Sequence, residues 1–117
     1  MTYSIFDKDK GTVISGKARI AKSFGLRLKG LMFKKEIDEK EALIFHNAPA
    51  IHTCFMRFAI DIVFLDKSNK VIRICEAVKP WKMVTCSKAA ITIELPANRA
   101  KRRSLALGDQ LEITLGD

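Results

Sequence analysis

The chain has 117 residues, of which 48% are hydrophobic, and a formal net charge of +8. This length suits one domain with a single modest core, which we expect to span residues 1–117. No run approaches the roughly 18 consecutive apolar residues that a membrane-spanning helix needs. The first ten residues lack the apolar centre of a secretion signal. We therefore expect a cytoplasmic protein without a membrane span.

Short apolar and β-branched runs, separated by turn residues, follow one another along the chain and predict many short strands. We predict a hairpin turn at 7–11, with Gly11 in the left-handed region of backbone conformation. In a second predicted turn at 66–70, the Asp66 side chain accepts hydrogen bonds from backbone amides of the same turn. Pro80 breaks the pattern after the second hairpin. We expect strands at 2–6, 12–15, 42–46, 51–55, 60–65, 71–78, 90–95 and 110–115.

Two short helices complete the predicted elements. Ser23 is typical of a helix N-cap, and the predicted helix runs through about Met32. A second, basic helix is expected within 97–105. Because strands and helices do not alternate regularly, the fold class is mainly β (α+β). We predict a compact antiparallel β-barrel or rolled sheet of about seven strands.

The cysteines and histidines do not form a recognisable metal or disulfide pattern. Cys54, Cys75 and Cys86 cannot all pair within one chain, and no CxxC is present. Without an export signal, reduced thiols are the default. We expect no metal and no cofactor.

The most apolar stretch, residues 51–66, contains three polar residues that a buried strand would have to satisfy. These are His52, Arg57 and Asp61, and a buried charge is costly unless it is paired and hydrogen-bonded. If the chain bends after Arg57, its guanidinium can meet the Asp61 carboxylate in a bidentate pair. That pair is either a structural clamp or an anion-binding arginine with its orienting partner. Arg27 can compete for the same carboxylate.

An enzymatic interpretation uses the same stretch. On a strand, His52 and Cys54 share a face, which permits a nucleophile and base or merely a core histidine beside a buried thiol. Glu94 lies in an apolar run. Because side chains along a strand alternate between its two faces, Glu94 shares a face with Thr92, and we first expect that face to be solvated. If Glu94 instead points inward, it joins Asp61 as a second candidate acid.

A basic cluster lies in the second predicted helix. Arg99, Lys101, Arg102 and Arg103 recur at spacings that place most of them on one side. Such a cluster, together with the basic first third of the chain, is one way to bind nucleic acid. A solvated helix face explains it equally well.

Six motifs, in order, resemble the bacterial and archaeal family known as domain of unknown function 192. They are RLKGLMF (27–33), ALIF (42–45), HTCFMRFAIDIVFLD (52–66), VKP (78–80), ELPA (94–97) and GD (108–109). The resemblance covers nearly the whole chain and implies a compact β-rich domain, but no activity. The family usually has proline at Ala59, glycine at Asn98 and often an aromatic residue at Cys54. Asn98 can keep the turn, because asparagine tolerates left-handed backbone.

Three functional hypotheses follow. The first is a non-enzymatic domain that binds a small molecule or protein through His52, Arg57, Asp61 and Arg27. The second is nucleic-acid binding through the basic helix. The third is a small hydrolase using His52 with Asp61 or Glu94, which requires these groups to converge in one pocket.

Overall fold

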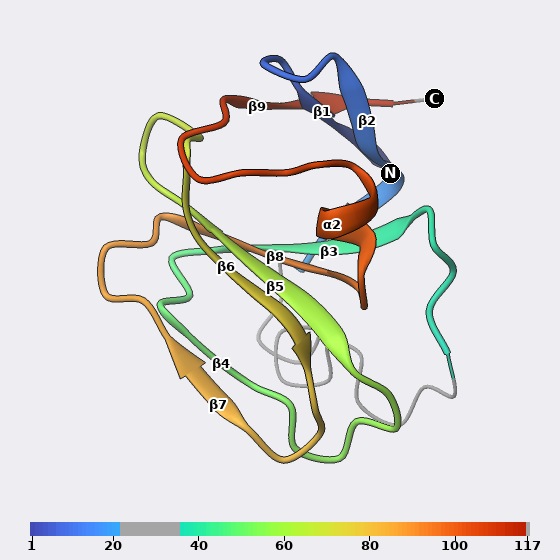
Figure 1. Ribbon diagram of the computed structural model, residues 1–117, viewed down its shortest axis with the longest axis vertical. Helices are drawn as coiled ribbons and strands as arrows, with labels where there is room; N and C mark the ends of the chain where they lie inside the picture. Colours follow the sequence, from blue (N-terminus) through green and yellow to red (C-terminus); the bar gives the residue numbers. More distant parts are fainter. Residues whose placement is uncertain (22–35, 117) are drawn as a thin grey trace.

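The computed structural model describes residues 1–21 and 36–116, and its main feature is a curled seven-stranded sheet (Figure 1). The strand order is β6-β5-β8-β3-β2-β1-β9, and β4 pairs with β7 in a separate two-stranded sheet. The elements are β1 (Tyr3–Asp7), β2 (Thr12–Ile20), β3 (Glu41–His46), β4 (Ala50–His52), β5 (Ile60–Leu65), β6 (Val71–Val78), β7 (Met83–Thr85), β8 (Ile91–Pro96), α2 (Arg99–Arg102) and β9 (Leu111–Leu115).

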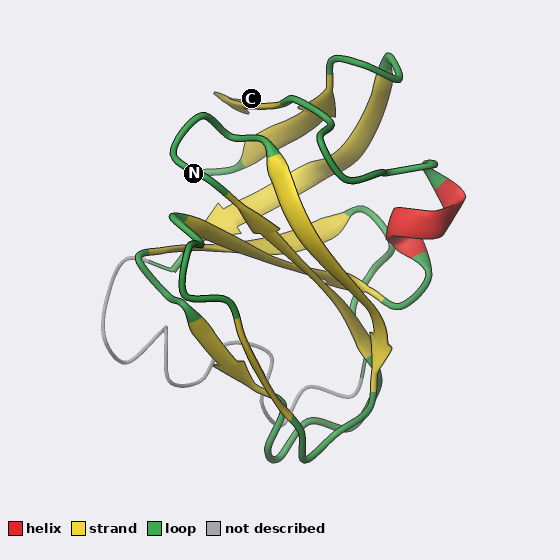
Figure 2. Cartoon of the chain, turned by 60° about the vertical axis from the view of Figure 1, so that its left-hand side comes forward, coloured by secondary structure: helices red, strands yellow, loops and turns green. Residues whose placement is uncertain are grey.

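The large sheet is antiparallel except where β2 runs parallel to β3. Its two edge strands, β6 and β9, approach each other through a bridge between Lys70 and Gln110. Beside it, the Leu111 amide donates to the Asn69 carbonyl at 2.9 Å. Figure 2 shows the resulting curl. The prediction of a mainly β rolled sheet is confirmed.

Several boundaries differ from the predicted ones. The strand expected at 51–55 ends at His52, because Phe55 has a positive φ of 64° that no strand permits. Strand β7 was not predicted. The basic helix is confined to Arg99–Arg102, between left-handed residues Asn98 and Ser104. The helix expected from Ser23 lies outside the described residues.

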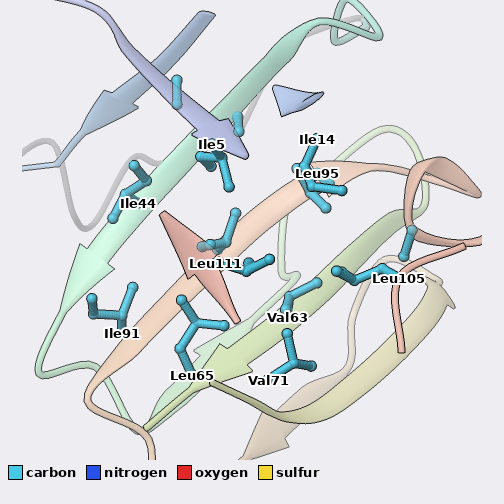
Figure 3. Packing of buried hydrophobic residues seen from close by; sticks show 14 residues of the cluster. Ile5, Ile14, Ile44, Val63, Leu65, Val71, Ile91, Leu95, Leu105 and Leu111 are labelled. Carbon is cyan, nitrogen blue, oxygen red and sulfur yellow. The ribbon is translucent and has the colours of Figure 1, made fainter. Parts of the chain in front are cut away.

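Each face of the large sheet carries its own hydrophobic cluster. The first cluster packs against Ala100 and Leu105 of α2 and the loop after it (Figure 3). The second packs against Ile51 and Val84 of the small sheet. Because β5 lies between the two clusters, all six of its residues are buried. The prediction of a strand buried on both faces is confirmed for Ile60–Leu65.

Asn98 precedes α2 with a φ of 70°, so the expected left-handed turn is present. We expect Asn98→Gly to unfold at the same denaturant concentration as the wild type or a slightly higher one. Asn98→Val should cost about 1–2 kcal/mol, because a side chain branched at Cβ is strained in this region. Urea denaturation followed by circular dichroism measures both. Equal midpoints for the glycine and valine variants would contradict this interpretation.

Candidate functional site

The three polar residues of the stretch 51–66 lie in three different environments. His52 is exposed at the end of β4, Arg57 is exposed in the following loop, and Asp61 is fully buried in β5. Arg27 lies outside the described residues. We predicted one polar patch from these residues, but the structure buries Asp61 away from the exposed His52 and Arg57.

Asp61 anchors backbone rather than a side-chain cation. Its Oδ1 accepts hydrogen bonds from the amides of Ala77 at 2.8 Å and Asn98 at 3.1 Å, and its Oδ2 accepts from Ala100 at 2.9 Å. Among the described residues no cation pairs with this carboxylate. The expected pair with Arg57 is thus not formed. The strongly turned backbone at Ala77 and Asn98, both with positive φ, supplies donors instead.

The residues of the hydrolase hypothesis are not brought together. Asp61 pairs across the sheet with Leu95 of the first cluster, whereas Glu94 pairs with Ile62 of the second, so the two acids project to opposite faces. His52 lies on the outer face of the small sheet. Its Nδ1 accepts a hydrogen bond from the Cys54 amide at 3.3 Å. Asp61 and His52 therefore lie on different sides of the large sheet.

Glu94 is buried, so the prediction that it lies on a solvated face is wrong. The second cluster and the small sheet cover the face of β8 that alternation suggested was open. Among residues 1–21 and 36–116, Oε1 of Glu94 has no hydrogen-bond partner, and burial raises the pKa of Glu94 to about 8. Glu94 is consequently a protonated carboxylic acid at neutral pH.

The basic residues of the second helix do not form one cationic face. Arg99 is buried, and its Nε donates to the Ile14 carbonyl at 2.9 Å. Burial, together with the nearby Arg103, lowers the pKa of Arg99. Lys101 and Arg102 are exposed, and Arg102 lies 3.5 Å from Glu39. The nucleic-acid hypothesis retains Lys101, Arg102 and the half-buried Arg103 on this surface.

One acidic cluster could hold a cation. Ligand atoms of Asp7, Asp9 and Asp109 lie within 4.8 Å of one another. However, Lys10 Nζ lies 3.0 Å from both carboxylate oxygens of Asp109 and supplies positive charge already. Burial and a hydrogen bond with Asp109 raise the pKa of Asp7, so these two carboxyls can share a proton. We assign no metal to this cluster, which ties the β1–β2 turn to the residues before β9.

A more distinctive surface forms where the loop before β5 meets the loop before β7, at the lower end of Figures 1 and 2. Phe55, Trp81 and Met83 expose 49%, 62% and 69% of their surfaces there. The same loops contribute three exposed cations and, between residues 52 and 60 and between 77 and 88, contain no acidic residue. We call this the aromatic–basic surface: Phe55, Arg57, Lys79, Trp81, Lys82 and Met83.

Thr53 holds the two loops together. This residue is fully buried, and its Oγ1 donates to the Lys79 carbonyl at 2.7 Å and accepts from the Lys82 amide at 2.8 Å. Its own amide donates to the Lys82 carbonyl at 2.8 Å, and its carbonyl accepts from the Trp81 amide at 3.1 Å. No local pattern singled out Thr53, because these partners lie more than 25 residues away along the chain.

The backbone at both aromatic residues is strained. Phe55 has a φ of 64° and Trp81 a φ of 66°, a region that bulky residues rarely adopt. Their rings meet edge to face, with centroids 4.7 Å apart. Each strained residue costs on the order of 1–3 kcal/mol, which persists only where surrounding contacts fix the backbone. Here those contacts come from Thr53, and they hold apolar rings toward solvent.

The chain is similar to a family of proteins across most of its length. Residues 5–113 match the model of the DUF192 family, described as "Uncharacterized ACR". A UPF0127 protein of Pyrococcus horikoshii is 34% identical over 116 residues, which cover 92% of this chain and 96% of the relative. A UPF0127 protein of Thermococcus sibiricus is 30% identical over 113 residues, covering 92% and 73%.

Two crystal structures share the fold. A protein of unknown function from Novosphingobium aromaticivorans has a TM-score of 0.80 at 21% identity, covering 94% of this chain and 82% of that one. A putative transcription regulator from Sinorhizobium meliloti has a TM-score of 0.81 at 19% identity, covering 94% and 90%. At these identities the likeness shows the fold alone. The motifs, the family match and the identity to the archaeal relatives together show that the chain belongs to the DUF192 (UPF0127) family.

Proposed function

We propose that this protein is a non-enzymatic binding domain whose aromatic–basic surface binds an anionic ligand that carries a planar ring. The observation that carries the proposal is the Phe55–Trp81 pair, held exposed in strained backbone by the buried Thr53. A fold that needed these rings only for stability would bury them, because burial of large aromatic side chains is strongly favourable.

The charge around the rings defines the ligand. Arg57, Lys79 and Lys82 are exposed, and no acidic residue interrupts residues 77–88. Exposed rings beside cations bind anions that also offer a π-face, with each stacked base worth about 1–3 kcal/mol in single-stranded nucleic acids. His52 pairs with Met83 across the small sheet and extends the surface. Asp61, which we predicted to share a patch with His52 and Arg57, is fully buried and is not part of this surface.

Intrinsic fluorescence tests this proposal directly, because Trp81 is the only tryptophan. Three probes separate the contributions: the single strand dT10, which has charges and rings; polyphosphate, which has charges alone; and thymidine, which has a ring alone. We expect dT10 to change Trp81 emission with the highest affinity and thymidine to leave it unchanged. Equal affinity for polyphosphate and dT10 would remove the role assigned to the rings.

Charge variants then locate the surface. In anisotropy titrations with labelled dT10, the double variant Lys79→Gln/Lys82→Gln should weaken binding by about tenfold at low salt. Each lysine that contacts a phosphate releases counterions on binding, and the variant loses this contribution at both positions. Lys101→Gln/Arg102→Gln removes the same charge from α2 and is the matched control, expected to change affinity little. The opposite ranking would favour the nucleic-acid hypothesis at the second helix instead.

A further inference from the structure

A separate candidate site lies between the large and the small sheet. Strands β6 and β7 are edge strands of their respective sheets, and a groove of about 570 Å³ opens beside them. Its lining includes Thr85 at the end of β7, whereas Trp81 precedes the start of this strand, so the groove is separate from the aromatic–basic surface. Its lining residues are Pro49, Ala50, Ile72, Arg73, Thr85, Cys86, Ser87 and Lys88.

The lining combines an apolar floor with cations and hydroxyl groups. Arg73 and Lys88 are both exposed, and none of the lining residues is acidic. Arg73 is held in place because its Nη1 donates to the Thr85 carbonyl. That single contact leaves further N–H donors on a guanidinium, whose planar fork suits carboxylate and phosphate oxygens. The hydroxyls of Thr85 and Ser87 add donors that do not carry charge.

The apolar side of the groove is fixed as well. Ile72 and Cys86 pack against the second hydrophobic cluster. The Cys86 amide donates to the Pro49 carbonyl at 2.7 Å, which joins the two sides of the opening. Ligand pockets are typically about 300–1,000 Å³, largely apolar, and contain a few fixed polar groups. This groove has that size and that chemistry.

We infer that the groove between β6 and β7 binds a small organic anion, with a carboxylate or phosphate held by Arg73 and Lys88 and an apolar body resting on Ile72 and Pro49. This site is independent of the ligand proposed for the aromatic–basic surface. It adds a small-molecule site to a domain whose other surface we propose to bind a ring-bearing anion.

Cys86 supplies a reporter for the test. Alkylation by iodoacetamide, followed by peptide mass spectrometry, gives separate rates for the three free cysteines. Phenyl phosphate is the probe, benzyl alcohol is its uncharged counterpart, and inorganic phosphate lacks the apolar body. We expect phenyl phosphate to slow alkylation of Cys86 several-fold, with Cys75 as the reference. Benzyl alcohol or phosphate at the same concentration should protect far less.

Variants and the third cysteine make the result specific. Arg73→Gln should abolish the protection, Arg73→Lys should retain part of it, and Lys101→Gln should leave it intact. Protection of Cys54 instead of Cys86 would place the anion at the aromatic–basic surface and overturn the inference. Equal protection by benzyl alcohol, or none by phenyl phosphate at millimolar concentration, would also overturn it. Thermal melting of each variant verifies that it is folded.

Discussion

Asp61→Ala is expected to lower the free energy of unfolding by about 3–5 kcal/mol, the largest loss from any single substitution considered for this chain. The substitution removes the acceptor for the amides of Ala77, Asn98 and Ala100. These donors lie where β6 ends and α2 begins, and all three lose a charge-assisted hydrogen bond to a fully buried carboxylate. Urea denaturation of the variant and the wild type measures the difference.

Asp66 provides a matched control. Its Oδ1 also accepts two backbone amides, those of Ser68 and Lys70, but in an exposed turn. Water can replace the lost acceptor there, so Asp66→Ala should cost about 1 kcal/mol or less. Asp61→Asn keeps one acceptor oxygen and should fall between the two. If Asp61→Ala and Asp66→Ala cost the same, Asp61 does not anchor the helix and the end of β6 as described.

Stability should fall as the pH rises from about 5 to about 9, and Glu94 should account for most of the fall. Burial raises its pKa from 4.5 to about 8, so the folded state binds a proton that the unfolded state has already released. A raised folded-state pKa gives stability that is complete below pH 4.5 and lost as the pH passes through about 8. The loss is on the order of 4 kcal/mol across that interval.

Glu94→Gln isolates this contribution, because glutamine has the same shape and does not titrate. The variant should be clearly more stable than the wild type at pH 9 and nearly equal to it at pH 5. Asp7 and Asp109 titrate in both proteins, so their effects cancel in the comparison. Parallel curves of unfolding free energy against pH for the two proteins would show that Glu94 is ionised in the folded state.

Local sequence signals predicted β5, β6 and the turn between them well, whereas β2 extends to Ile20, five residues beyond its predicted end. Strand β5 and strand β6 have the expected bounds, because their continuous apolar run and the Asp66 turn are local features. The end of β4 and the existence of β7 depend on left-handed backbone at Phe55 and Trp81. Neither residue type favours that conformation, so no sequence rule would have placed it there.

The candidate site was harder to predict than the fold for a similar reason. The cost of a buried charge correctly indicated that Asp61 has defined partners, but not that these are amides from distant loops. Alternation along β8 grouped Glu94 with Thr92 on one face, and the structure confirms that grouping. Whether the face is open depends on the small sheet, which comes from elsewhere in the chain. Thr53 and its partners in the loop at 79–82 show the same dependence on long-range contacts.

A nitrogen-15 NMR titration with dT10 is the most direct test of the central claim, that the aromatic–basic surface binds anionic, ring-bearing ligands. We predict that the shifted amides cluster at residues 53–58 and 79–83, together with the indole N–H of Trp81. The amides of α2 should stay unchanged. Shifts centred on Lys101 and Arg102, or no shifts at a salt concentration of about 50 mM where phosphate contacts are strong, would contradict the account.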